Sequence, residues 1–186
     1  MYKNVQDVHS RVLEGRDISK SSHQLNVQSL QADPTKTFFV TVTGIIIKDG
    51  KFLIAKRSDK EKMYPGQWTV PGGKFQTSDY TARAPNSQGL WYEVLESGLR
   101  REIKEEVDIE VENIRYVTSI TYVRPDGMHC LILSYACDHR SGDVTLCPAL
   151  TEHAWVTLEE AKGYDLIAGI YDELAATKRL VNGEGF

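Results

Sequence analysis

A cluster of acidic residues stands out in the segment R-R-E-I-K-E-E-V (Arg100–Val107). In a helix, a rotation of about 100° per residue would place Glu102, Glu105 and Glu106 within an arc of about 100°. Their place near the expected C-terminal end conflicts with the helix dipole, and like charges at these spacings repel by about 0.2–0.5 kcal/mol per pair. Mg²⁺ and Mn²⁺ prefer carboxylate and water oxygens, and either ion would relieve both conflicts. The spacing therefore predicts a site for a divalent cation.

An apolar stripe supports a helix from Leu90 to about Val107. Its buried positions recur every four residues, at Leu95, Leu99, Ile103 and Val107. The acidic arc lies beside this stripe and partly overlaps it, so the carboxylates sit at the margin of the buried face, whereas a purely solvated face would point away from the core. The interleaved Arg100, Arg101 and Lys104 keep a charge-laced surface helix as the alternative.

Strands must position this helix. Phe38–Lys48 and Lys51–Arg57 are apolar runs joined by Asp49-Gly50, the strongest short-range signal for a hairpin. The other expected elements are a strand at 67–70, a loop at 74–89, strands near 114–123, 129–137 and 152–156, and a tail over 157–180 that is helical in two pieces. Antiparallel hairpins mixed with helices predict an α/β or α+β fold with a mixed, largely antiparallel sheet.

Pro71-Gly72-Gly73 stops the strand that precedes the acidic helix. Paired glycines permit a tight backbone turn and let peptide groups approach a ligand closely. Alone, such a turn indicates only that a strand ends. Upstream of an acidic helix, it also supports a ligand site formed together with that helix.

Composition limits the function classes. The chain has 186 residues and a net charge of −4, so no basic footprint points to a nucleic-acid duplex. No stretch approaches the roughly 20 apolar residues of a membrane span, and the N-terminus has no apolar core typical of a signal peptide. The three cysteines form no CxxC pair, which favours a reduced, cytoplasmic protein. We expect an N-terminal extension over 1–36, as an arm or short helix, and one domain over 37–182.

With the acidic run and the glycine turn in place, the chain resembles the Nudix hydrolase family, also called MutT-like proteins. The family's box runs Gly, five residues, Glu, seven residues, then Arg-Glu-apolar-any-Glu-Glu-any-Gly-apolar. Arg101–Val107 matches its second half, and Ile109 fills the final apolar place. Seven residues separate Glu93 from Arg101, as the box requires, and Gly73 is similar to the opening glycine.

The resemblance covers roughly residues 38–180, with two departures. Gly73 and Glu93 are separated by 19 residues, 14 more than the five of the box. We expect these extra residues in a loop at about 74–89, where insertions are cheap and where they could form a lid, contact substrate or contact a second subunit. Asp108 replaces the late glycine, whose left-handed conformation Asp tolerates better than most residues.

The resemblance implies roles for the charged residues of the box. The three glutamates of the acidic run bind Mg²⁺ or Mn²⁺, with the Gly72 carbonyl as a further ligand. Arg101 pairs with Glu93 and fixes the helix against the loop. The alternative for Glu93 is an ordinary glutamate on the helix surface.

The general base and the substrate contacts follow from the same resemblance. Glu102 or Glu105 would orient the attacking water, or Glu152 would do so from a later segment, its alternative being a strand-end residue that caps a turn. The groups expected to contact substrate are Arg57, Tyr64, Gly73 and Lys74. Arg57 would meet a phosphate or be a surface cation, and Tyr64 is available to stack a base.

The implied reaction is Mg²⁺-dependent hydrolysis of a pyrophosphate bond in a nucleotide-type small molecule, by attack of water at phosphorus. Nucleoside triphosphates are the first choice of substrate. Nucleotide sugars or ADP-ribose are the alternative, since the N-terminal arm could support a homodimer that shares a site. A further alternative is a nucleotide-sensing or partner-binding module without turnover. The fold implied is the family's α/β/α sandwich.

Overall fold

The structure, a computed structural model, describes residues 33–124 and 126–184. Residues from Pro34 onward form one compact unit, which begins with a 3₁₀ turn, η1 (Pro34–Lys36). The prediction of an N-terminal arm or short helix otherwise falls on residues 1–32, outside the described residues. No helix among the described residues has the length and apolar character needed to cross a membrane.

The predicted hairpin is confirmed as β1 (Phe38–Lys48) and β2 (Lys51–Arg57). Its turn places both Asp49 and Gly50 at positive φ, 51° and 73°, which is why an Asp-Gly pair marks it in the sequence. The other strands are β3 (Trp68–Thr69), β4 (Gly72–Lys74), β5 (Glu110–Val123), β6 (His129–Ser141) and β7 (Leu150–Val156). The helices and remaining 3₁₀ turn are α2 (Ser78–Thr81), α3 (Val94–Val107), η2 (Glu160–Gly163) and α4 (Ile170–Val181).

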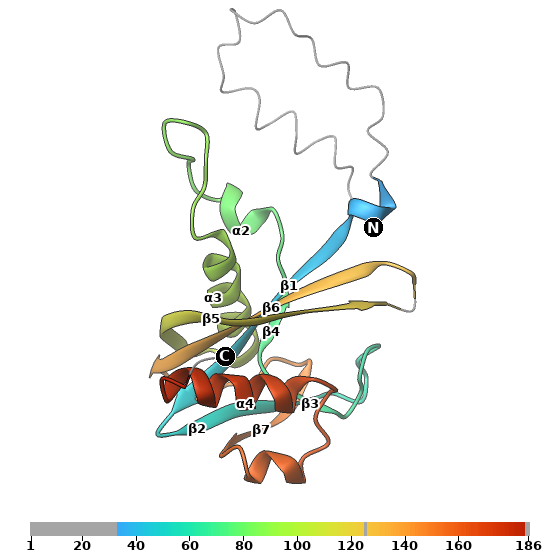
Figure 1. The fold of residues 1–186 in the computed structure, drawn as a ribbon, viewed down its shortest axis with the longest axis vertical. Helices are drawn as coiled ribbons and strands as arrows, with labels where there is room; N and C mark the ends of the chain where they lie inside the picture. Colours follow the sequence, from blue (N-terminus) through green and yellow to red (C-terminus); the bar gives the residue numbers. More distant parts are fainter. Residues whose placement is uncertain (1–32, 125, 185–186) are drawn as a thin grey trace, which may run out of the picture. The chain divides into compact units, whose positions relative to one another are not determined.

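The strands form a single mixed sheet (Figure 1). Its main order is β3-β2-β1-β6-β5, with β4 also pairing with β1 and β7 with β2. Of these pairs only β1 with β6 is parallel, so the predicted mixed, largely antiparallel sheet is confirmed. β1 and β2 pair only beside their turn, and β4 then takes the freed edge of β1, with Gly72 opposite Thr43. The separation of β1 from β2 beyond their turn therefore leaves room for the glycine turn beside β1.

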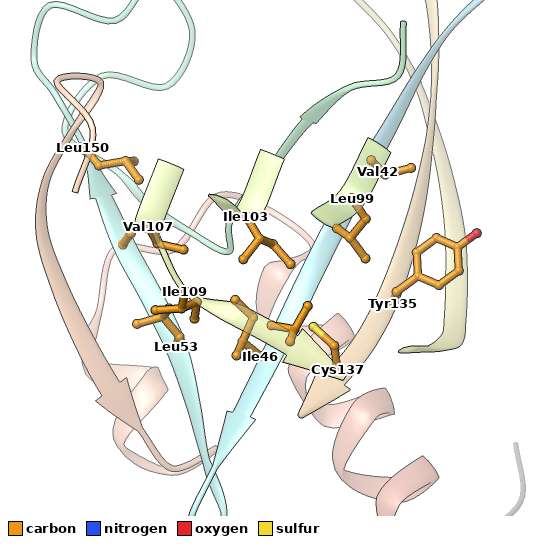
Figure 2. Close-up of a cluster of buried hydrophobic side chains, with 12 residues drawn as sticks. Val42, Ile46, Leu53, Leu99, Ile103, Val107, Ile109, Tyr135, Cys137 and Leu150 are labelled. Carbon is orange, nitrogen blue, oxygen red and sulfur yellow. The ribbon is translucent and has the colours of Figure 1, made fainter. Parts of the chain in front are cut away.

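One helix covers each face of the sheet. α3 buries Leu99, Ile103 and Val107 against residues of β1 and β2 such as Val42, Ile46 and Leu53, as Figure 2 shows. α4 buries Ile170 and Leu174 in a second cluster on the other face. The helix–sheet–helix layering matches the predicted sandwich. The apolar stripe of α3 therefore fixes the direction of its acidic margin.

Gly44 of β1 sets how closely α3 approaches the sheet. A Cβ at this position would lie 2.8 Å from Ile103 Cδ1 and 3.3 Å from Leu99 Cδ1. The helix therefore packs onto backbone at this point, close enough for its acidic margin to reach β4.

The segment between the glycine turn and α3 differs from the prediction. The expected loop at 74–89 contains the short helix α2, and α3 begins at Val94 rather than at Leu90. Tyr80 of α2 stacks on Phe75 at 5.9 Å and meets Trp91 edge-on at 5.3 Å. These ring contacts join positions five and eleven residues apart and make no periodic apolar pattern, so periodicity does not indicate the helix.

α4 also buries a carboxyl that the sequence did not single out. Glu173 is 4% exposed. Ser134 Oγ donates to its Oε2 at 2.7 Å, and Thr43 Oγ1 donates to Ser134 Oγ at 3.0 Å. Burial raises the pKa of Glu173 above the ordinary value of 4.5, and the Ser134 hydrogen bond opposes the rise.

Replacing Glu173 with Gln should stabilise the fold at high pH. Because the folded-state pKa is raised, the folded protein holds this proton more tightly than the unfolded chain does, and stability falls as pH rises from 4.5 through the folded pKa. Gln keeps an oxygen for Ser134 and cannot ionise. We expect the melting temperature of the variant to exceed that of the wild type by about 2–4 °C at pH 8, with the gap closing near pH 4.5.

The matched control is Glu159→Gln, at a side chain that is 82% exposed. It should show no such pH-dependent gap. A Glu173→Gln gap of equal size at both pH values would contradict the account, because ionisation would not be its source.

Candidate active site

The glycine turn lies in β4, which pairs with β1 and lies against α3. Gly72 has φ 155°, and a Cβ there would lie 2.3 Å from the Val42 carbonyl oxygen. A Cβ on Gly73 would lie 2.4 Å from Glu102 Oε2. Close approach to backbone therefore requires glycine at position 72, and Gly73 lies directly against a carboxylate of the acidic helix.

Glu106 and Glu102 point into this junction with raised pKa values. The Gly72 N–H donates to Glu106 Oε2 at 2.9 Å. Burial nevertheless raises the pKa of Glu106 to about 7, with the Gly72 hydrogen bond opposing the rise and the Glu102 charge adding to it. Burial also raises the pKa of Glu102, against the lowering effect of its bond to Arg101. A cation placed between these two groups would favour their ionised forms.

Arg101 is the cation that the chain itself supplies. It pairs with Glu102 Oε1 at 2.8 Å and with Glu105 Oε2 at 2.9 Å. It also donates to the Lys74 carbonyl oxygen at 3.1 Å, which ties α3 to β4. Glu105 is the more open partner, with a side chain 59% exposed.

The predicted pairing of Arg101 with Glu93 is wrong, because Arg101 pairs instead with Asp79 of α2. Its Nε lies 2.5 Å from Asp79 Oδ1 and its Nη2 lies 3.2 Å from Oδ2. The Asp79 side chain has no exposed surface and also accepts from the Gln76 N–H at 2.8 Å. Glu93 precedes α3 at φ 54°, and its backbone oxygen accepts from Ser97.

The spacing of the chain agrees with this assignment. Five residues separate Gly73 from Asp79, the interval of the box, so the extra 14 residues correspond to 80–93 and leave seven, 94–100, before Arg101. The insertion expected at about 74–89 thus corresponds to residues 80–93 in this assignment. Counting forward from Gly73, with Asp allowed in place of Glu, was the signal available in the sequence.

Two backbone features complete the frame of the box. A Cβ at Gly98 of α3 would lie 2.9 Å from Asp79 Oδ2 and 3.1 Å from Phe75, so glycine there makes room for Asp79. Asp108 closes α3 at φ 54°, and its N–H donates to the Lys104 oxygen. The expected left-handed end of the helix is confirmed at a non-glycine residue.

The acidic margin is not arranged as a finished metal site. Among residues 33–124 and 126–184, no three or more His, Cys, Asp or Glu side chains are grouped so as to hold a metal ion. Arg101 engages Glu102 and Glu105, while the Gly72 amide engages Glu106. The donors nevertheless fit a hard cation, since they are carboxylates and two of them are partly buried with raised pKa. Ion binding would require Glu105 to turn away from Arg101.

A cavity of about 610 Å³ adjoins this margin at Gly73. The cations that line it come from four separate segments and are Arg57, Lys60, Lys62, Lys74 and Arg124. Its aromatic lining is Phe39 and Tyr122. Glu61 is its acidic lining residue and is paired with Arg57 at 2.9 Å. The cavity is therefore suited to an anionic ligand with a flat apolar part.

The model of the NUDIX domain matches residues 38–176. The chain belongs to the Nudix family. It is a pyrophosphohydrolase of the Nudix type, a hydrolase that acts on acid anhydrides. The nucleoside triphosphatase NudI of Klebsiella pneumoniae (strain 342) is 30% identical over 139 residues, which cover 68% of this chain and 87% of that protein.

Solved Nudix structures share the fold. The NUDIX domain of Shewanella oneidensis NrtR, complexed with ADP ribose, aligns with a TM-score of 0.62 and 17% identity over 81% of this chain and 94% of that one. An ADP-ribose pyrophosphatase from Streptococcus suis 89-1591 aligns with a TM-score of 0.59 and 18% identity over 81% and 96%. At these identities the likeness shows the fold alone.

Of the four residues predicted to contact substrate, three line the cavity and one does not. Arg57, Gly73 and Lys74 line the cavity, but Arg57 is engaged, since its Nε donates to the Met63 oxygen and its Nη2 to Glu61. Tyr64 lies outside the lining and is 38% exposed. The sequence missed Phe39, Tyr122, Arg124 and the two loop lysines, because only the pairing of distant strands gathers them.

Glu152 pairs with a lysine on the neighbouring strand. It lies on β7 opposite Lys56 of β2, and Lys56 Nζ donates to its Oε1 at 2.8 Å. Its side chain is 56% exposed. Within the described part of the chain, this cross-strand pair is its side-chain contact, so the geometry gives no support to Glu152 as the base.

Proposed function

We propose that the chain is a Mg²⁺-dependent nucleoside triphosphate pyrophosphohydrolase. The observation that carries this proposal is a cation-lined cavity whose lining includes Gly73, the residue against which the Glu102 carboxylate of α3 lies. Such a cavity holds the phosphate chain of a nucleotide while its end delivers one phosphorus to the acidic margin. The nucleoside triphosphatase NudI, at 30% identity, supports the same substrate class.

Glu102, Glu105 and Glu106 would hold Mg²⁺ or Mn²⁺, with the Gly72 carbonyl as a further ligand. A bound cation would neutralise charge on the phosphates and favour attack by water. Glu102 or Glu105 would orient that water. Arg101 keeps the acidic margin against β4 through the Lys74 carbonyl. The partly buried Glu106 gives up its proton more readily once a cation is near, which couples metal binding to proton release.

The charge of the cavity favours a triphosphate. Lys60 and Lys62 line it and form no ion pair within the described residues, so their charge is available to a ligand. A terminal phosphate carries about −1.5 to −2 charge at pH 7, more than a phosphate bridged on both sides. The free end of a triphosphate would therefore gain more from these lysines than a nucleotide sugar would.

Hydrolysis of ADP-ribose or a nucleotide sugar is the second candidate. The specific observation in its favour is that structural neighbours of this chain are a complex with ADP ribose and an ADP-ribose pyrophosphatase. We also propose that the protein forms a homodimer that shares a site. A cytoplasmic location is part of the same proposal. The unpaired thiols of Cys130, Cys137 and Cys147 are consistent with that location.

A substrate panel with Mg²⁺ or Mn²⁺ tests the proposal. Ribo- and deoxyribonucleoside triphosphates, ADP-ribose and a nucleotide sugar are incubated with the full chain. The nucleoside monophosphate product is measured by chromatography for every substrate, together with phosphate and pyrophosphate from the triphosphates and the sugar phosphate from the other two. We expect kcat/KM at least tenfold higher for one or more triphosphates than for ADP-ribose. The reverse order would select the second candidate, and tight binding without product would indicate a nucleotide-sensing module.

A further inference from the structure

We propose that the guanidinium of Arg124 is the platform on which the nucleobase of the substrate stacks. The inference rests on the proposed nucleotide substrate and specifies which end of the cavity holds the base. The base would lie where β5 turns toward β6, and the phosphates would lie toward Lys60, Lys62 and the glycine turn.

Arg124 is backed by an aromatic ring. Its Cζ lies 4.6 Å from the ring centroid of Phe39 on β1. Lys74 Nζ lies 5.5 Å from the same ring. Both Phe39 and Arg124 line the cavity, so the pair forms part of its wall. A planar guanidinium stacks on aromatic faces, including those of unpaired bases.

The orientation of Arg124 is fixed by its own turn. Its Nε and Nη2 donate to Asp126 Oδ1 and Oδ2 at 3.2 and 2.8 Å. The Arg124 N–H donates to the Met128 oxygen and the Gly127 N–H donates to the Arg124 oxygen, each at 2.9 Å. A side chain held in this way presents a plane without first losing rotamer freedom.

The same contacts separate Arg124 from the phosphate-binding cations. Its charge is balanced by Asp126, whereas Lys60 and Lys62 form no ion pair among the described residues. A balanced, flat cation attracts a phosphate less than a free lysine does, but it still stacks on a base. Lys60 and Lys62 are therefore suited to the phosphates, and Arg124 is suited to a flat ring.

The distance along β1 is suited to this division. Thr43 pairs with Gly72 at the acidic margin, and Phe39 lies four residues earlier on the same strand. At about 3.3 Å per residue, the two positions are about 13 Å apart. A nucleoside with its extended phosphate chain can bridge that span, with the base at Phe39 and Arg124 and the reacting phosphate near Gly72.

Binding measurements test the platform without requiring turnover. The dissociation constants of a non-hydrolysable nucleoside triphosphate and of inorganic tripolyphosphate are measured for the full chain and for Arg124→Lys and Arg124→Met. Lys keeps the charge without the plane, and Met removes both. We expect both variants to weaken nucleotide binding about tenfold and to change tripolyphosphate binding less than twofold.

Arg115→Lys is the matched control, because Arg115 lies on β5, pairs with Asp138 of β6 at 2.8 Å and does not line the cavity. It should leave both dissociation constants unchanged. Full binding by Arg124→Lys, or equal weakening for both ligands, would overturn the platform in favour of a phosphate contact. A wild type that binds tripolyphosphate as tightly as the nucleotide would also overturn it. The absence of hydrolysis would instead overturn the proposed function and leave these binding results to decide on Arg124.

Discussion

Replacing Glu106 with Gln is expected to lower metal-dependent turnover at least about tenfold, equivalent to about 1.4 kcal/mol of barrier. A Gln side chain can still accept the Gly72 hydrogen bond, so the contact between α3 and β4 survives. What it lacks is the negative charge that a divalent cation needs. Steady-state hydrolysis with Mg²⁺ and with Mn²⁺ measures the effect, and Glu105→Gln should show a loss of the same order.

Stability separates this effect from unfolding. Burial holds the pKa of Glu106 at about 7, so its ionised form already opposes folding above that pH when no cation is present. The Gln variant should therefore melt no lower than the wild type at pH 8 in the absence of metal. Glu96→Gln, on the first turn of the same helix, is the control and should retain turnover. Unchanged turnover in both Glu105 and Glu106 variants would remove these carboxylates from the mechanism.

Local signals account for the parts of the fold that the sequence predicted. The Asp49-Gly50 turn needs two residues at positive φ, and few other pairs supply them. The stripe of α3 repeats every four residues because one face is buried against β1 and β2. α2 lacks such a signal, because its position depends on Asp79 meeting Arg101 and on Tyr80 packing between Phe75 and Trp91.

The site shows where spacing alone is ambiguous. An insertion of 14 residues can stand before or after the first acidic residue of the Nudix box, and both Glu93 and Asp79 satisfy one of the two intervals. Only the fold shows which carboxylate reaches Arg101. The cavity is similarly hidden, since Phe39, Tyr122 and Arg124 meet through the pairing of β1, β6 and β5.

Asp79→Asn is expected to damage both stability and turnover, although Asp79 lies in a segment that reads as a loop. Leaving Arg101 half-buried without its strongest partner should cost about 2–4 kcal/mol, near the range for breaking a buried ion pair. Arg101 also contacts Glu102 and Glu105, so its displacement should lower kcat at least about tenfold in the variant that remains folded. Chemical denaturation and steady-state kinetics at a temperature well below melting measure the two effects.

Two further variants decide whether Asp79 acts as the acidic residue of the Nudix box. Asp79→Glu keeps a carboxylate at this interval, where the family has Glu. It should retain much of the turnover that Asp79→Asn loses, limited by the close fit of Gly98 against Asp79 Oδ2. Glu93→Gln should change stability and kcat little, since Arg101 does not pair with Glu93. If Glu93→Gln were the damaging change and Asp79→Asn the silent one, the insertion would lie before the acidic residue. The helix of the box would then be held by a contact other than the Asp79–Arg101 pair.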